Sequence, residues 1–155
     1  MLIEVTINGI LKWFETSPGE ILLDLLRREG YKSVKRGCET GECGACSIIL
    51  DGKLAKSCLL FAPQVSGHEI VTLEGMGSFS KLHPIQRAFL DEGAVQCGFC
   101  TPGMILAAKT LLEENPHPTE EEIKEAISGN LCRCTGYVKI IRAIKRAGEI
   151  LKENV

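Results

Sequence analysis

The sequence predicts an α+β protein, in which a small β-sheet crossed by one helix is followed by a bundle of four helices. Three observations lead to this prediction. The apolar pattern changes from alternating to helical after residue 81, a Gly- and Ser-rich stretch lies over 75–80, and eight cysteines form two sets of four on either side of it. A chain of 155 residues can form one full domain or two small ones. We expect a first domain over 1–74, a linker over 75–81 and a second domain over 82–155.

The strands of the first domain follow from alternation and from turn residues. Residues 2–7 alternate between apolar and polar side chains, as a half-buried strand does. Asn8 and Gly9 both tolerate positive φ, so they predict a tight hairpin turn and a second strand that returns over 10–15. Further strands are expected over 47–50, 53–60 and 69–73, with a turn at 51–52 between the first two.

One helix is expected between the second strand and the first cysteines. Ser17 suits the N-cap, Pro18 suits the first helical position, and Glu20 completes a capping box. Apolar residues within 21–26 form one helical face, and Gly30 suits the end of the helix. A small sheet with one helix across it, and a cysteine loop after that helix, is a β-grasp, ferredoxin-like arrangement.

Four helices are expected in the second domain, because the apolar residues there recur with helical spacing. Thr119 and Glu122 form a capping box at the start of the third helix, and Gly129 suits its end. His83 precedes a proline and suits a helix cap or an interface better than a metal site. Short connections predict a compact four-helix bundle. The expected helices cover 84–92, 101–115, a third from residue 120 to the Gly129-Asn130 pair, and 137–151.

The first set of cysteines lies in a glycine-rich loop. Cys38, Cys43 and Cys46 fall within residues 37–46, and Cys58 follows after a short apolar segment. The spacing C-x4-C-x2-C…C is the plant-type pattern for a [2Fe–2S] cluster, whose two irons need four thiolates beside the bridging sulfides. Glycines let the loop wrap closely and direct its N–H groups at the sulfurs. A structural zinc site, which usually takes two separated pairs of ligands, and a pair of disulfides are weaker alternatives.

The second set of cysteines consists of two short pairs. Cys97 and Cys100 precede one of the two longer expected helices, and Cys132 and Cys134 precede the other. Helix N-termini offer N–H groups and the positive end of the dipole to an anionic cluster. Spacing alone leaves zinc and iron equally open here, and a thioredoxin-like redox pair expects a βαβ setting that is missing. The predicted first cluster favours iron at the second set, because a second redox centre would extend an electron-transfer chain.

Composition argues against several other functions. Acidic and basic residues are interspersed and the net charge is −2, so no basic stripe would neutralise the phosphates of a nucleic acid. No run approaches the ~18 apolar residues of a membrane span. The first residues lack the pattern of a signal peptide, so we expect a cytoplasmic protein. A periplasmic complex is also compatible if a partner chain carries the export signal. No nucleophile–base arrangement and no strand followed by G-x-G-x-x-G is present, so no catalytic residue is expected on this chain.

Three motifs together resemble one protein family. The loop over 37–46, Gln-Cys-Gly-Phe-Cys-Thr-Pro-Gly over 96–103 and Cys-Arg-Cys-Thr-Gly-Tyr over 132–137 are similar to the iron–sulfur (small) subunits of the xanthine oxidase, or molybdenum hydroxylase, family. The likeness extends to the small chains of carbon monoxide dehydrogenase and related bacterial or archaeal hydroxylases. It covers essentially the whole chain, from the first expected strand to the last expected helix.

The resemblance implies two [2Fe–2S] clusters and a role for each cysteine. The first cluster would lie near FAD, and the second near the molybdopterin cofactor. Gln96 would hydrogen-bond the pterin of that cofactor, and Cys134 would bind iron and also lie against the pterin amino group. The implied iron ligands are Cys38, Cys43, Cys46 and Cys58 for the first cluster, and Cys97, Cys100, Cys132 and Cys134 for the second.

The resemblance also implies a function and partners. The chain would be an oxidoreductase subunit without a substrate site of its own, passing single electrons between molybdopterin on a large subunit and FAD on a medium subunit. The assembly would be a heterotrimer or a dimer of heterotrimers. A free-standing two-cluster ferredoxin and a zinc-stabilised structural module are the alternatives. The substrate stays open among purines, aldehydes, carbon monoxide, N-heterocycles and aromatic thioesters, because its contacts would belong to the molybdenum subunit.

Overall fold

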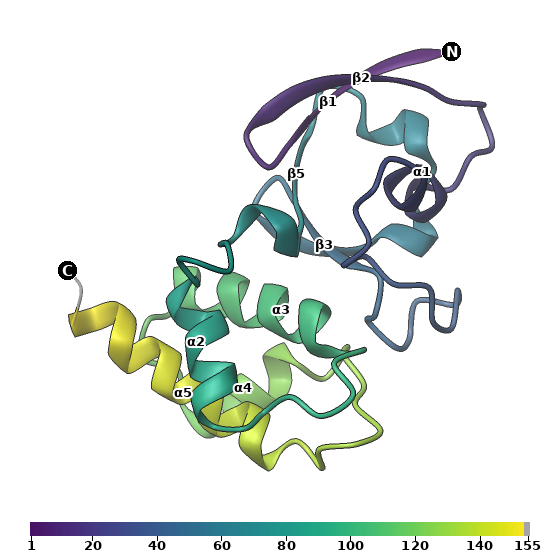
Figure 1. The fold of residues 1–155 in the computed structure, drawn as a ribbon. Coiled ribbons are helices and arrows are strands. Elements are labelled where there is room, and N and C mark those ends of the chain that lie inside the picture. Colours follow the sequence, from purple (N-terminus) through teal and green to yellow (C-terminus); the bar gives the residue numbers. More distant parts are fainter. Residues whose placement is uncertain (154–155) are drawn as a thin grey trace.

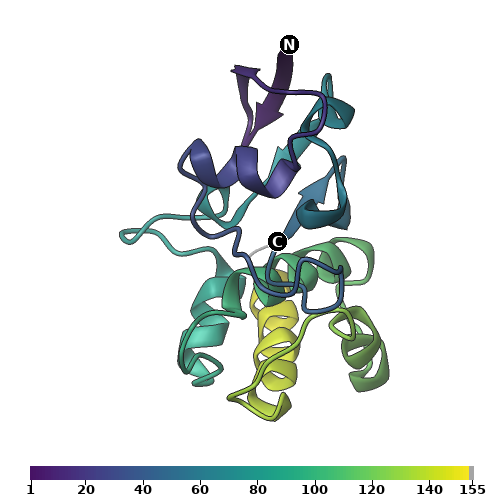
Figure 2. The same cartoon turned by 90° about the vertical axis from the view of Figure 1, so that its right-hand side faces the viewer.

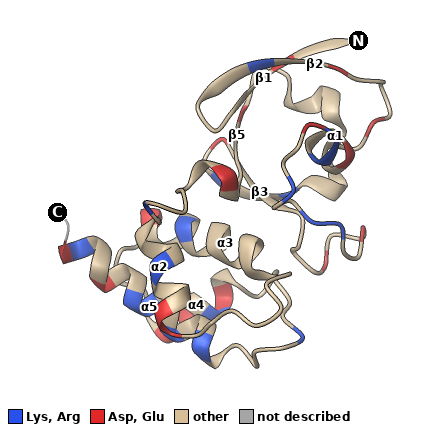
Figure 3. Ribbon diagram, in the orientation of Figure 1, with Lys and Arg blue, Asp and Glu red and all other residues tan. Residues whose placement is uncertain are grey.

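The computed structural model describes residues 1–153, and Figure 1 shows two halves stacked on one another. The N-terminal half is a β-sheet with one α-helix, and the C-terminal half is a group of α-helices, so the predicted α+β class is confirmed. Figure 2 shows the same separation from a second direction. Figure 3 shows that acidic and basic residues are interspersed over both halves. Within residues 1–153, no helix is long and apolar enough to cross a lipid bilayer.

The sheet has five strands within the described residues: β1 (Leu2–Ile7), β2 (Ile10–Glu15), β3 (Ser47–Leu50), β4 (Lys53–Lys56) and β5 (Glu69–Val71). Their order across the sheet is β2-β1-β5-β3-β4. The hairpin between β1 and β2 turns at Asn8 and Gly9, where φ is 53° and 78°, as the sequence predicts. β5 lies parallel to β1 and antiparallel to β3, which makes the sheet mixed.

One helix, α1 (Leu22–Arg28), packs on the inner face of the sheet. Four of its leucines are buried together with Ile3, Val5 and Ile7 of β1. Successive side chains of a strand point to opposite faces, so β3 serves two cores. Ile48 belongs to the core under α1, whereas Ile49 belongs to the core of the helical half. The helical half is therefore attached to the sheet along β3.

The predicted start of α1 at Ser17 is wrong. The helix begins at Leu22, and its N-cap, Ile21, makes no side-chain capping bond. The reason is a pairing with residues far along the chain: the N–H of Leu22 donates to the carbonyl of Leu60 at 2.8 Å, and the N–H of Ala62 donates to that of Glu20 at 2.7 Å. This pairing holds the backbone extended at Ile21, which bridges to Phe61, so the helix cannot start before Leu22.

The predicted strand over 53–60 is too long. β4 ends at Lys56, and a 3₁₀ turn, η1 (Ser57–Leu59), follows it. The turn is tied back to the first cysteine loop, because Oγ of Ser57 donates to the carbonyl of Cys46 at 2.8 Å. Two further 3₁₀ turns, η2 (Ala62–Val65) and η3 (Leu73–Gly75), flank β5.

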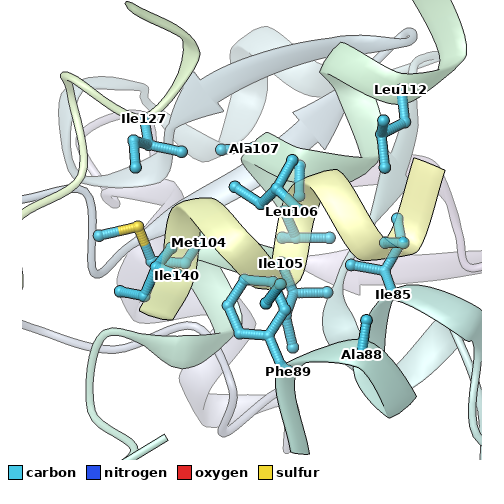
Figure 4. Close-up of a cluster of buried hydrophobic side chains, with 14 of the residues drawn as sticks. Ile85, Ala88, Phe89, Met104, Ile105, Leu106, Ala107, Leu112, Ile127 and Ile140 are labelled. Carbon is cyan, nitrogen blue, oxygen red and sulfur yellow. The ribbon is translucent and has the colours of Figure 1, made fainter. Parts of the chain in front are cut away.

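Four α-helices follow the sheet within residues 1–153: α2 (Pro84–Asp91), α3 (Thr101–Glu114), α4 (Glu120–Ala126) and α5 (Val138–Glu153). Their apolar faces meet in a second core, in which Phe89, Met104 and Ile140 are buried (Figure 4). This core confirms the predicted helical bundle. Residues 154–155 of the expected second domain lie outside the described part of the chain.

Three predictions concern the ends of these helices, and the structure agrees with two of them. Nδ1 of His83 accepts a hydrogen bond from the N–H of Ile85 at 3.2 Å, so His83 caps α2. Thr119 and Glu122 form the predicted capping box of α4. However, α4 ends at Ala126, before the predicted Gly129. Short-range turn bonds, such as the 3.1 Å bond from the N–H of Ser128 to the carbonyl of Glu125, replace the helical pattern there.

Candidate metal centres

The loop between α1 and β3 brings Cys38 and Cys43 together. The N–H of Cys43 lies 3.3 Å from Sγ of Cys38, and the N–H of Cys38 lies 3.4 Å from Sγ of Cys43. The N–H groups of Thr40 and Ala45 add contacts of 3.4 Å to Cys38 and 3.5 Å to Cys43. The loop therefore directs N–H groups at both sulfurs, which stabilises thiolates and would stabilise an anionic cluster.

Cys46 and Cys58 form a second pair beside the first one. Both are buried, and the thiol of Cys46 contributes to raising the pKa of Cys58. The 3₁₀ turn after β4 carries Cys58 to this position, which a continuing strand would not do. The structure thus gathers the four cysteines of the first predicted set from two segments, the loop before β3 and the 3₁₀ turn η1.

The thiols of this group differ in acidity. Hydrogen bonds from the side chain of Thr40, and then from the N–H groups of Cys43 and Thr40, lower the pKa of Cys38 to about 5. Burial, followed by the effect of the Cys46 thiol, raises the pKa of Cys58 to about 11. A coordinated metal deprotonates a thiol outright, so the buried Cys58 suits a metal ligand better than a free thiolate.

The second group lies at the start of two helices. Sγ of Cys134 lies 3.6 Å from Sγ of Cys97, and the thiol of Cys132 contributes to raising the pKa of Cys100. Cys100 is the N-cap residue of α3, and the Cys132–Cys134 segment leads into α5. The helix starts meet at the cysteines, as the sequence predicts, and this suits a negatively charged group.

Burial and hydrogen bonding have opposite effects on the pKa values of the thiols in the second group. Burial, the largest effect, raises the pKa of Cys100 to about 12. Burial also opposes ionisation of Cys132, but hydrogen bonds from Thr135 outweigh it and lower the pKa of Cys132. The hydroxyl and N–H of Thr135 lie 3.0 Å and 3.4 Å from that sulfur. A cavity of about 400 Å³ opens beside the group, lined by its four cysteines with Phe99, Leu131, Arg133 and Tyr137.

In both groups the thiols approach each other in twos. The pairs are Cys38 with Cys43, Cys46 with Cys58, Cys97 with Cys134, and Cys100 with Cys132. Within residues 1–153, no three or more Cys, His, Asp or Glu side chains surround a position for a single metal ion. Two irons that share bridging sulfides each take two thiolates, so the pairwise arrangement fits a [2Fe–2S] cluster at each group.

Comparisons with known proteins agree with this geometry. A family model described as a 2Fe-2S iron-sulfur cluster binding domain matches residues 5–70, and one described as a [2Fe-2S] binding domain matches 72–145. Each match contains one of the two cysteine groups.

Relatives and a solved structure match nearly the whole chain. The nicotinate dehydrogenase small FeS subunit of Eubacterium barkeri is 52% identical over 148 residues, which are 95% of this chain and 94% of the relative. The xanthine dehydrogenase iron-sulfur-binding subunit of Escherichia coli O157:H7 is 48% identical over 145 residues, 92% of this chain and 91% of the relative. Quinoline 2-oxidoreductase from Pseudomonas putida 86 contains a chain with a TM-score of 0.94 and 45% identity, covering 99% of this chain and 96% of that one. The chain belongs to the molybdenum hydroxylase family.

As an iron–sulfur small subunit of a molybdenum hydroxylase, the chain has two [2Fe–2S]-binding domains and acts in electron transfer within an oxidoreductase complex. The predicted family, class of function and type of cluster are therefore confirmed. The structure also brings the eight predicted ligands together in the two predicted sets. Gln96 is exposed and directly precedes Cys97, and Cys134 is exposed as well.

The sequence does not predict the role of one buried residue in the small subunit. Asn130 is only 2% exposed, and its Nδ2 donates to the carbonyl of Gly44 at 3.1 Å and to Oγ of Ser47 at 3.2 Å. It thereby joins the two cysteine groups. The sequence assigns Gly129-Asn130 to a helix end, where asparagine is common, so the pattern offers no sign of a buried contact.

Proposed function

We propose that the eight cysteines are the iron ligands, in the two sets that the sequence predicts. The pairwise approach of the thiols supports this most directly, together with the N–H groups directed at Cys38, Cys43 and Cys132. A bound [2Fe–2S] cluster supplies one-electron redox chemistry. The protein's own residues hold the cluster, donate hydrogen bonds to its sulfur ligands and adjust its reduction potential through burial and charge.

Metal analysis of the purified protein tests the ligand sets. Two [2Fe–2S] clusters require about four iron and four acid-labile sulfide per chain, with the matching visible absorption. A colourless protein that holds zinc and no sulfide would contradict the proposal and would favour the zinc-stabilised structural module.

We also propose that the chain passes single electrons between a molybdopterin cofactor on a large subunit and FAD on a medium subunit. The surface around the second group supports a large partner there. Cys97 and Cys134 are exposed, and Phe99, Leu131 and Val138 near them are 46%, 54% and 56% exposed. Apolar side chains gathered beside a redox group favour an interface over a face in contact with water. Gln96 and Cys134 would meet the pterin at this interface.

Co-purification tests the partners. From its native source the chain should elute with a molybdenum-binding large chain and an FAD-binding medium chain, as a heterotrimer or a dimer of heterotrimers. A chain that elutes alone with both clusters would contradict this and would favour a free-standing two-cluster ferredoxin.

We propose the domain boundaries that the sequence predicts, 1–74 and 82–155, with a linker over 75–81. Two separate hydrophobic cores within the described residues support them, one within residues 3–70 and one formed mainly by residues 76–147. A cytoplasmic location and the lack of a nucleic-acid partner stay predictions. Substrate contacts would belong to the large subunit.

A further inference from the structure

A backbone hydrogen bond joins the two cysteine groups. The N–H of Leu131 donates to the carbonyl of Cys43 at 2.8 Å. Cys43 belongs to the first predicted ligand set, and Leu131 directly precedes Cys132 of the second set. A ligand of one group is thus connected to a ligand of the other through a single hydrogen bond and a short piece of main chain.

The side chain of Asn130 anchors this connection. Its Nδ2 donates to the carbonyl of Gly44 and to Oγ of Ser47, at 3.1 Å and 3.2 Å, in a buried position. Gly44 follows Cys43, and Asn130 precedes Leu131, so the side-chain bonds and the backbone bond hold the same two segments at adjacent residues. Such a double attachment restrains both the distance and the orientation of the segments.

Two glycines allow the segments to come so close. A Cβ atom on Gly44 would lie 2.5 Å from Nδ2 of Asn130 and 2.5 Å from the carbonyl oxygen of Gly129. A Cβ atom on Gly103, in the first turn of α3, would lie 2.4 Å from the carbonyl oxygen of Gly44. Neither position has room for a side chain. The first cysteine loop, the start of α3 and the segment before Cys132 therefore meet at Asn130.

The two halves of the Asn130 amide differ in their hydrogen bonding. Among the described residues, Oδ1 of Asn130 is buried without a hydrogen bond. A buried acceptor without a partner is unfavourable, and an apolar side chain would avoid that cost. The donor half of the amide is consequently what the site uses.

We propose that Asn130 is a positioning residue for electron transfer between the two clusters. By holding the N–H of Leu131 on the carbonyl of Cys43, it sets the separation of the two ligand groups. The proposal rests on the ligand sets of the proposed function. In the transfer, one electron leaves the cluster at the Cys132 set and enters the cluster at the Cys43 set. The first is oxidised by one electron, the second is reduced by one, and no bond or proton changes place.

Two variants of Asn130 test the role in the intact, cluster-loaded complex. Asn130→Leu removes both donated bonds, and Asn130→Asp keeps the shape but offers an acceptor where the carbonyl of Gly44 needs a donor. One readout is hydrogen–deuterium exchange at the Leu131 amide. The other is the magnetic splitting between the two reduced clusters in electron paramagnetic resonance, which depends on their separation and orientation. Neither readout requires enzyme turnover.

We expect both variants to keep the iron and sulfide content and the individual signal of each cluster. The Leu131 amide should exchange about tenfold faster, the scale of one lost buried hydrogen bond. The magnetic splitting should shrink or disappear. Asn115→Leu is the matched control, because it removes a 3.2 Å bond from Nδ2 of Asn115 to Glu122, between α3 and α4. It should keep the wild-type splitting.

Wild-type exchange and wild-type splitting in the Asn130 variants would overturn the positioning role. If neither variant accumulates with its clusters, Ser47→Ala replaces them and leaves Asn130 in place. It removes one of the two acceptors of Asn130, together with the bonds of Oγ of Ser47 to the carbonyl of Gly44 and to Lys56. Faster exchange at Leu131 with altered splitting is then expected, and unchanged values overturn the proposal. Failure of the proposed ligand sets is visible separately, since wild-type protein would then lack iron and sulfide before any Asn130 variant is made.

Discussion

The side chain of Lys56 shows how a single residue can act on a cluster that it does not bind. Its Nζ donates to Oγ of Ser47 at 3.2 Å and to the carbonyl of Gly129 at 2.7 Å. It therefore lies where the segments that carry the two cysteine groups meet. Burial lowers the pKa of Lys56, and the nearby thiols, that of Cys46 foremost, act in the opposite direction. An anionic cluster would strengthen this opposing effect and keep the ammonium charged.

Replacing Lys56 by methionine should make the first cluster harder to reduce. The ammonium favours the extra negative charge of the reduced cluster, so its loss should lower that cluster's reduction potential by on the order of tens of millivolts. Redox titration followed by electron paramagnetic resonance measures the change. Lys53→Met, on an exposed residue of the same strand, is the control and should leave the potential unchanged. Equal potentials in Lys56→Met and wild type would refute this role.

Gln96→Ala should affect the partner cofactor and leave the clusters intact. The side chain is exposed next to Cys97, where it is available to a partner, and an amide can both donate to and accept from a pterin ring. Loss of one such bond should weaken retention of the molybdenum cofactor about tenfold. Molybdenum content and iron content of the purified complex are the measurements. Gln64→Ala serves as the control, since the side chain of Gln64 accepts from the N–H of Phe61 within its own turn. Normal molybdenum content and turnover in Gln96→Ala would remove the proposed role.

At the scale of elements, two capping motifs that look alike in sequence behave differently. Thr119 and Glu122 form their box at the start of α4, where no strand within residues 1–153 pairs with the backbone. Ser17 and Glu20 do not form one, because residues 20–22 pair with residues 60–62. The carboxylate of Glu20 instead accepts a 2.7 Å bond from Oγ1 of Thr16. Long-range pairing decides whether a local capping preference is used.

This difference predicts unequal costs for two similar substitutions. Thr119→Ala should reduce the free energy of unfolding by about 1 kcal/mol, because an N-cap bond to the N–H of Glu122 at 3.2 Å is lost. Ser17→Ala should change it by less than about 0.5 kcal/mol, as exposed substitutions away from special contacts do. Thermal unfolding of both cluster-loaded variants checks this. A larger loss in Ser17→Ala than in Thr119→Ala would show that the observed start of α1 is wrong.

At the scale of the whole molecule, each cysteine group is supported by its own core. Cys46 and Cys58 are buried within the core under α1, whereas Cys100 and Cys132 pack against the core of the helical half. Strand β3 lies between the two cores, with Ile48 in one and Ile49 in the other. Each ligand set can therefore be disturbed without taking away the support of the other set.

Cys43→Ser and Cys100→Ser should each remove one cluster. The first variant should lose the signal of the N-terminal cluster and the second that of the helical cluster, because each substitution removes a ligand from one set only. Electron paramagnetic resonance of the reduced variants, with iron analysis, measures this, and about two irons should remain in each. Loss of both signals from a variant that stays folded would contradict the division into two domains.

The sequence by itself determines the local features of this protein. The cysteine spacings, the Asn8-Gly9 hairpin and the capping box at Thr119 all depend on residues within a few positions of each other, so their chemistry is visible in the chain. For the same reason the eight candidate ligands and the α+β class could be predicted without a structure.

Only the tertiary structure decides how these parts meet. The pairing of thiols in twos, the late start of α1 and the 3₁₀ turn that carries Cys58 depend on segments far apart in the chain. The clearest case is Asn130, whose amide reaches Gly44 across 86 positions of sequence. Periodicity and spacing report on neighbours along the chain, whereas a buried hydrogen bond between distant segments exists only once both cores have packed and brought those segments together.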